Sequence, residues 1–220
     1  MGIDTSSRVG SVAVIEKKRI IDEILSEKAR SFSRSLLGMI EAILARNNLK
    51  LTDLSAIACA VGPGSFTGIR IGLSTIQGIA ISTGVPVYGI STLQAMAAAA
   101  TKDAATLCPV IDAGKAGVYY ALFENSERLL EDAFGTIEDA VEKSPENAVF
   151  FGDVSSGDKE SLAGMSRTFD DSCMENSSAA GAALAAVQTI APERIASDKD
   201  EGGGLERLRP NYIRKSYAEK

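Results

Sequence analysis

Two aspartates stand where carboxylate chemistry can arise. Asp4 and Asp112 each end a short apolar run, directly before a turn that contains glycine. A carboxylate at such a strand end can help to place a metal ion while backbone N–H groups of the turn hold phosphate oxygens. It can also cap its own turn by accepting backbone N–H bonds. The turn after Asp4 begins with Thr5 and Ser6 and offers a single glycine by residue 10, so we favour capping at both aspartates over a nucleotide site.

A glycine-rich stretch over residues 60–72 is the most distinctive local sequence, and it leads from a buried apolar run into a helix N-terminus. Anions bind at helix N-termini. The stretch has no lysine for a P-loop, and Thr67 stands where a dinucleotide loop has its third glycine. Taken alone it is a tight turn with Ser65 or Thr67 as helix cap. Together with Asp4, Thr5, Ser6 and Asp112, a vestigial nucleotide loop would consist of Gly62, Pro63, Gly64, Ser65 and Thr67.

Histidine is absent from the 220 residues. This excludes histidine-based metal sites, Ser-His-Asp and Cys-His catalysis, and histidine acid–base chemistry. The three cysteines are far apart, and Cys59 and Cys108 lie in apolar runs where a thiol acts as a small hydrophobe. No secretory signal and no membrane-length apolar stretch is visible. We expect a cytoplasmic protein with reduced cysteines, no metal and no cofactor.

The composition is that of an ordinary globular protein, with 45% hydrophobic and 24% charged residues and a net charge of -6. An acidic surface does not favour general nucleic-acid binding. The segment 205–220 runs against this average, with five basic residues against two acidic ones. We favour a solvated basic tail there over a phosphate-contacting one.

The hydrophobic periodicity of the first half predicts three strands, then helix, strand, helix, strand, helix. The expected strands cover residues 2–5, 11–15, 19–25, 56–61 and 85–90, and the expected helices cover 31–46, 68–83 and 91–101. The second half repeats this plan. Its expected strands cover residues 107–112, 117–123, 128–132, 148–152 and 167–169, and its expected helices cover 137–143, 159–164 and 177–190.

Two copies of a β-β-β-α-β-α-β-α unit indicate an α/β protein with two ribonuclease-H-like lobes, paired as in actin, sugar kinases and Hsp70. We expect an N-terminal actin-like lobe over residues 1–104 and a C-terminal actin-like lobe over 105–204. The basic tail over 205–220 would follow the second lobe.

The second expected helix has two apolar or small-residue stripes, which leaves it little polar face. One stripe consists of Gly68, Gly72, Thr75 and Ile79, and the first helix offers a comparable set in Leu36, Leu37, Ile40 and Ile43. One stripe can pack on the sheet, and small residues on the other permit close helix–helix approach. Exposed apolar stripes are a liability for a soluble monomer, so we prefer a partner interface to a simple core here.

Several of these stretches together resemble the TsaB (YeaZ) family. They are residues 3–6, the apolar helix around Leu36, the stretch from Val61 to Gly72, and residues 110–113, 151–153 and 210–214, in the same order along the whole chain. The family commonly has His-Ser-Glu where this chain has residues 32–34, Phe-Ser-Arg.

The resemblance implies a role in forming N6-threonylcarbamoyladenosine at position 37 of tRNAs that read codons beginning with A. It implies a non-catalytic scaffold that pairs with the transferase TsaD, works with the ATPase TsaE, meets tRNA only through the complex, and pairs with itself when alone. It also argues against a metallopeptidase. The residues implied to form the partner interface of the N-terminal lobe are Phe32, Leu36, Leu37, Ile40, Ile43, Gly68, Arg70, Gly72, Thr75 and Ile79.

One alternative function stays open beside the scaffold, and one prediction about the interface can be tested. Asp4 and Asp112 leave open a small ATP-dependent kinase of the same fold. If the two helices form the interface, Leu36→Glu or Ile40→Glu should disturb association more than folding.

Overall fold

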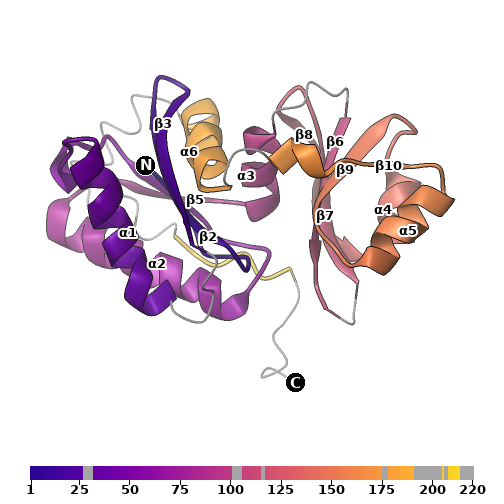
Figure 1. Cartoon of the computed structure of the whole chain (residues 1–220), viewed down its shortest axis with the longest axis horizontal. Helices are drawn as coiled ribbons and strands as arrows, with labels where there is room; N and C mark the ends of the chain where they lie inside the picture. The colour runs from indigo at the N-terminus through magenta and orange to yellow at the C-terminus, as the bar shows by residue number, and fades with distance from the viewer. Residues whose placement is uncertain are drawn as a thin grey trace.

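Two five-stranded mixed sheets lie side by side along the long axis of the molecule (Figure 1). The computed structural model describes residues 1–26, 32–100, 106–114, 117–174, 178–190, 205 and 208–213. The first sheet contains β1 (Gly2–Asp4), β2 (Gly10–Glu16), β3 (Arg19–Ser26), β4 (Ile57–Ala60) and β5 (Val87–Ile90). The second contains β6 (Thr106–Asp112), β7 (Val118–Glu124), β8 (Glu127–Gly135), β9 (Ala148–Asp153) and β10 (Thr168–Phe169).

The two sheets have the same topology. Their strand orders are β3-β2-β1-β4-β5 and β8-β7-β6-β9-β10. In each sheet the first three strands pair antiparallel. The fourth strand pairs parallel with the first, and the fifth pairs parallel with the fourth. The predicted duplication is confirmed at the level of the fold.

The described residues form six α-helices, which complete the two units in the predicted order. They are α1 (Phe32–Arg46), α2 (Phe66–Thr83), α3 (Thr92–Ala99), α4 (Ile137–Lys143), α5 (Ser156–Gly164) and α6 (Ser178–Thr189), with short 3-10 turns η2 (Leu51–Asp53) and η3 (Asp171–Met174). The ends of α2 follow from its sequence. The Ser65 hydroxyl caps the start, and Gly84 ends the helix in the left-handed conformation that glycine adopts without strain.

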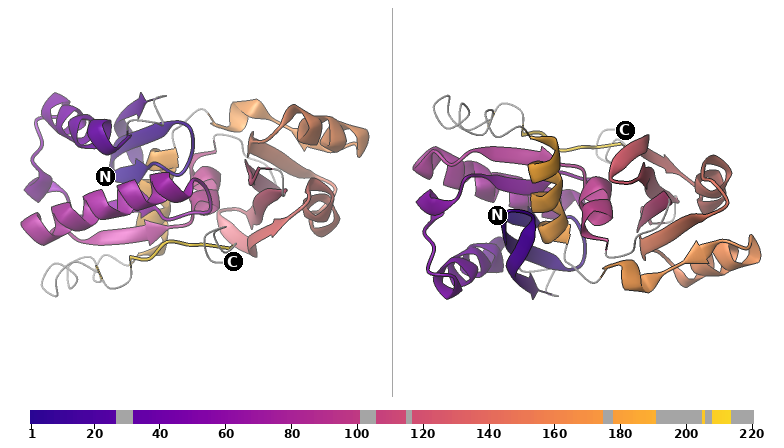
Figure 2. Two further views of the ribbon diagram at one scale, coloured as in Figure 1. Left: turned by 90° about the horizontal axis from the view of Figure 1, so that it is seen from below. Right: turned by 90° about the horizontal axis from the view of Figure 1, so that it is seen from above.

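The first sheet is covered on both faces. Helices α1 and α2 lie on one face and α6 on the other (Figure 2). This explains why β4 reads as a continuous apolar run in which all four residues are buried. The second sheet has α4 and α5 on its outer side, while α3 contacts β6 and β7 from the inner side.

The two inner helices, α3 and α6, pack against each other between the sheets. Both are rich in alanine, and the contact is so close that a Cβ atom at Gly181 would overlap the carbonyl oxygen of Ala95. Although α6 comes from the second repeat, it packs on the first sheet. The boundary between the two lobes at residues 104 and 105 therefore stays a prediction. In the structure each unit contributes a helix that packs on the sheet of the other, α6 on the first sheet and α3 on the second.

The C-terminal segment returns to the first unit. Leu208 is buried in the core that Ile3, Ile40 and Ile69 help to form, and the backbone N–H of Asn211 donates to the carbonyl of Val61 at 2.7 Å. Leu208 and the backbone of Asn211 therefore pack against the first unit, whereas Arg209 between them is exposed, as expected of a solvated basic residue. The basic residues 207, 214, 215 and 220 lie outside the described part of the chain.

Among the described residues, no helix combines the length and the apolar character needed to cross a bilayer.

Candidate functional site

Asp4 and Asp112 occupy equivalent positions in the two units, and each closes its own turn. Asp4 Oδ1 accepts from the backbone N–H of Ser6 at 2.6 Å, and Asp112 Oδ1 accepts from that of Gly114 at 2.7 Å. Both bonds run from residue i+2 back to residue i, which is the geometry of an Asx turn. Both aspartates thus cap their own turns, as the sequence predicts.

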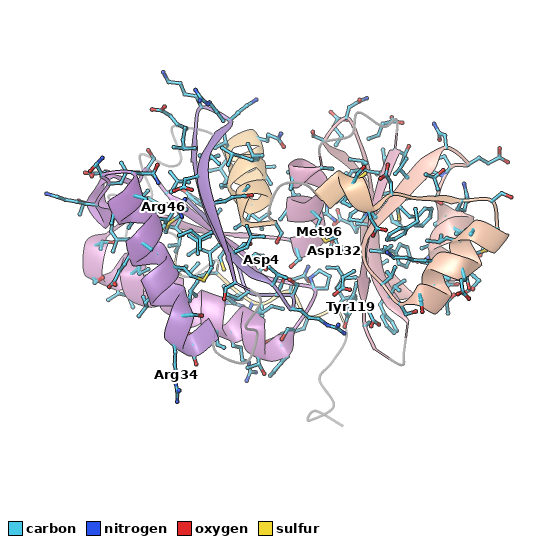
Figure 3. The ribbon with its side chains drawn as sticks, viewed as in Figure 1. Asp4, Arg34, Arg46, Met96, Tyr119 and Asp132 are labelled. Carbon is cyan, nitrogen blue, oxygen red and sulfur yellow. The ribbon has the colours of Figure 1, made fainter. Side chains whose placement is uncertain are left out.

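Asp4 is also the more enclosed of the two. Its side chain is 1% exposed, and its second carboxylate oxygen, Oδ2, accepts a hydrogen bond from the Ser178 hydroxyl at the start of α6. Figure 3 shows Asp4 near the middle of the molecule, between the two sheets. Oδ1 thus closes the turn within the first unit, while Oδ2 joins this unit to α6, so both oxygens have a protein partner.

The glycine-rich loop packs on the turn that follows Asp4. The Thr5 hydroxyl donates to the carbonyl of Gly68 at 2.7 Å, and the Ser65 N–H donates to the carbonyl of Ser6 at 2.6 Å. A Cβ atom at Gly64 would collide with the carbonyl oxygen of Ser6, and one at Gly68 with that of Thr5. The glycines are needed because two backbone segments meet here.

Ser65, not Thr67, caps α2. The Ser65 hydroxyl accepts from the N–H of Gly68 at 3.2 Å, whereas Thr67 is exposed. Gly62 and Pro63 are buried beneath the C-terminal segment, where a Cβ atom at Gly62 would lie 2.7 Å from the carbonyl oxygen of Asn211.

A cleft of about 430 Å³ opens between the two units. Its walls are mostly apolar, with Arg8 and Asp153 as exposed charged residues. Thr92 at the start of α3 is one of the residues that line this cleft, and its buried hydroxyl has no hydrogen-bond partner among the described residues. Over the described ranges, no group of three or more Cys, Asp or Glu side chains is arranged to hold a metal ion.

The two cysteines in apolar runs are buried in the sheets. Burial raises the pKa of the Cys59 thiol, and the nearby Asp4 carboxylate adds to this shift. Burial likewise raises the pKa of Cys108, with a small opposing effect from Arg167. Neither thiol is a candidate nucleophile, because the thiolate is the reactive form.

The structure corrects much of the predicted partner interface. Leu36, Ile40 and Ile43 of α1 are at most 2% exposed and belong to the first core, as does Ile79 of α2. Gly68 and Gly72 face Thr5 of the same chain. This chain itself covers these residues, because the apolar stripes of both helices turn toward the sheet and toward each other. The side chain of Phe32 lies outside the described part.

The exposed residues of α1 and α2 are different ones, and we call part of them the outer helix face. It consists of Arg34, Leu37, Gly38, Glu41, Ala42 and Ala45 on α1 and Arg70, Ser74, Gly78 and Ile81 on α2. Leu37 is 54% exposed and Ile81 is 75% exposed. A Cβ atom at Gly38 or Gly78 would meet nothing within 4 Å. The side chain of Arg34 extends away from the molecule (Figure 3).

At the N-terminal end of α2, Phe66, Arg70 and Tyr212 form a cluster that sequence reasoning missed. The two rings stack with centroids 5.0 Å apart, and Arg70 lies on the Phe66 ring. Arg70 is in the predicted interface set, but nothing in the sequence links it to a tyrosine 142 residues away. The only signal was the resemblance of residues 210–214 to the family.

Comparison with known families gives one match that covers most of the chain. The family profile for TsaD, tRNA N6-adenosine threonylcarbamoyltransferase, matches residues 20–218. Curated relatives carry the name tRNA threonylcarbamoyladenosine biosynthesis protein TsaB. The Escherichia coli protein is 36% identical over 129 residues, which are 58% of this chain and 55% of the relative. The Haemophilus influenzae protein is 38% identical over 125 residues, 55% of this chain and 52% of the relative.

The alignment thus spans about half the length of these curated relatives. Solved structures extend the likeness. YeaZ from Pseudomonas aeruginosa is 26% identical with a TM-score of 0.70, over 96% of this chain and 97% of that one. The ROK hexokinase from Thermus thermophilus is 14% identical with a TM-score of 0.54, over 86% and 98% of the two chains, and shares the fold alone. The chain therefore belongs to the TsaD family, and within it to the TsaB (YeaZ) group.

Proposed function

We propose that this chain is a non-catalytic partner subunit of TsaD in the formation of N6-threonylcarbamoyladenosine at position 37 of tRNAs reading codons that begin with A. The observation that carries the proposal is the outer helix face. Large apolar side chains at positions 37 and 81 stand exposed among small residues, which is the surface that another helix pair can cover.

The residues around Asp4 support a non-catalytic role. Both carboxylate oxygens are engaged by Ser6 and Ser178, and the glycine-rich loop is closed by Thr5 and Ser6. A nucleotide-dependent kinase would need these groups for phosphate and metal. The lack of histidine in the sequence argues in addition against a metallopeptidase.

The complex would include TsaE, and tRNA would contact it mainly through the other subunits, since this chain has a net charge of -6. In isolation, the outer helix face would pair with a second copy. With this role in tRNA modification, we expect the protein to work in the cytoplasm.

Light scattering after gel filtration tests the proposal with the full chain, alone and mixed with TsaD from the same organism. We expect a heterodimer with TsaD. Leu37→Glu should abolish it while the variant stays folded, because this side chain is exposed in the free chain. No association of the wild-type chain, with or without nucleotide, would contradict the proposal.

Binding of Mg-ATP to the isolated chain separates the scaffold from the kinase alternative. We expect no tight binding by calorimetry. Tight binding that Asp4→Asn removes would favour the kinase.

A further inference from the structure

Arg70 is held in place from two sides by aromatic residues. Its Nε donates a hydrogen bond to the Tyr212 hydroxyl at 3.2 Å, and its Cζ lies 3.8 Å from the centre of the Phe66 ring. The Phe66 and Tyr212 rings are stacked with an interplanar angle of 27°. An exposed arginine normally samples many rotamers and loses this freedom on binding. Because the contacts with Phe66 and Tyr212 already restrict Arg70, its side chain loses little further conformational entropy when it binds another molecule.

Tyr212 can hold Arg70 because its own backbone is fixed. Asn211 donates from its backbone N–H to Val61 at 2.7 Å, and from Nδ2 to Asp132 Oδ2 at 2.8 Å. Three residues earlier, Leu208 is buried in the first core. The Tyr212 ring therefore stands on a segment tied to both units, and is still 39% exposed.

Among the described residues, the two terminal amino groups of Arg70 have no hydrogen-bond partner. Across the described ranges, no carboxylate forms an ion pair with Arg70, and α2 itself contains no acidic residue. Stacking uses the face of a guanidinium and leaves its in-plane N–H groups free, in the geometry that fits a carboxylate with two parallel hydrogen bonds.

The surroundings favour an acidic group in this place. Arg34 is a second exposed cation of the outer helix face, and Glu41 is its single carboxylate, although the whole chain has a net charge of -6. Arg70 lies on the same stripe of α2 as Ser74 and Ile81, so it stands at one end of the apolar part of that face.

We propose that Arg70, oriented by Phe66 and Tyr212, is the polar anchor of the outer helix face and binds an aspartate or glutamate carboxylate of the partner subunit. The C-terminal segment thereby becomes part of the binding surface. This inference rests on the proposed function, because TsaD is the partner in which the carboxylate is sought.

The test is the dissociation constant of the full chain with TsaD at low and at high salt. Arg70→Gln should weaken binding at least tenfold and flatten its salt dependence. Arg70→Lys keeps the positive charge but cannot form two parallel hydrogen bonds to a carboxylate, so its affinity should lie between those of Arg70→Gln and the wild type. Tyr212→Phe keeps the stack and removes one hydrogen bond, so we expect about a threefold loss. Arg19→Gln removes an exposed arginine away from the face and should change binding less than twofold.

The outcomes separate this inference from the proposed function. One outcome is that the wild type binds TsaD, Leu37→Glu does not, and Arg70→Gln binds as the wild type does at both salt concentrations. The outer helix face would then be the binding surface for TsaD, and the proposed role of Arg70 would be wrong. If the wild-type chain does not bind TsaD, both are wrong. Thermal unfolding of each variant checks that a loss of affinity does not come from a loss of fold.

Discussion

Asn211 bonds to both units of the molecule at once: its backbone N–H donates to Val61 in the first, and its Nδ2 donates to Asp132 in the second. Asp132 is further paired with Arg128. Asn211 thus links the start of the glycine-rich loop to β8 through two hydrogen bonds. The contact between α3 and α6 joins the same two units at another place.

Asn211→Ala should lower the free energy of unfolding by about 1 kcal/mol, because it removes one side-chain hydrogen bond and leaves the backbone bond to Val61 intact. Urea unfolding measures this change. Arg209→Ala, at an exposed neighbouring position, is the matched control and should change stability by less than about 0.5 kcal/mol. Equal stability of the two variants would mean that the Asp132 contact contributes nothing to holding the units together.

Leu36→Glu and Leu37→Glu should have opposite consequences, although the positions are adjacent. Leu36 is 2% exposed and Leu37 is 54% exposed. A carboxylate at position 36 would be buried unpaired in the first core and should cost about 3–5 kcal/mol of stability. The same change at position 37 should leave the melting temperature nearly unchanged and remove association with TsaD. Circular dichroism and gel filtration read the two effects.

These neighbours show how far the sequence could be read. The period of the apolar residues placed α1 correctly and identified Leu36, Ile40 and Ile43 as one stripe. It could not say whether the sheet or another molecule covers that stripe. Periodicity shows which residues share one face of a helix, but it does not show what packs against that face. The expectation that Leu36→Glu or Ile40→Glu affects association more than folding is therefore replaced by the prediction for Leu37.

The turn chemistry at Asp4 and Asp112 was predictable because an Asx turn depends on residues two apart. The bonds that join Asp4 to Ser178 and Asn211 to Asp132 were not, since they connect residues 174 and 79 positions apart. Interleaved packing of α3 and α6 was hidden for the same reason. Alanine-rich helices carry little periodic signal, and their partners come from the other repeat.

Gly181→Ala and Gly78→Ala add the same methyl group to two helices and should shift stability in opposite directions. At Gly181 the added Cβ overlaps the carbonyl of Ala95, so α3 and α6 must move apart, at a cost of about 1–3 kcal/mol. At Gly78 the Cβ meets nothing, and alanine should stabilise α2 by about 0.5–1 kcal/mol. Thermal unfolding measures both. A stable Gly181→Ala variant would contradict the close approach of the inner helices.

The buried cysteines predict both the reactivity of the chain and its behaviour at high pH. Cys59, Cys108 and Cys173 are 0% exposed, and burial raises the pKa of the first two thiols. Native protein should therefore resist iodoacetamide at pH 8, whereas protein in denaturant should take up the reagent at all three cysteines. Unfolded thiols ionise near pH 8.5, whereas burial keeps the thiols of Cys59 and Cys108 protonated in the folded protein. Above that pH the unfolded state binds fewer protons than the folded state, so stability should fall as pH rises further. Replacing Cys59 with alanine should reduce this slope, and rapid alkylation of the native chain would contradict the burial of its thiols.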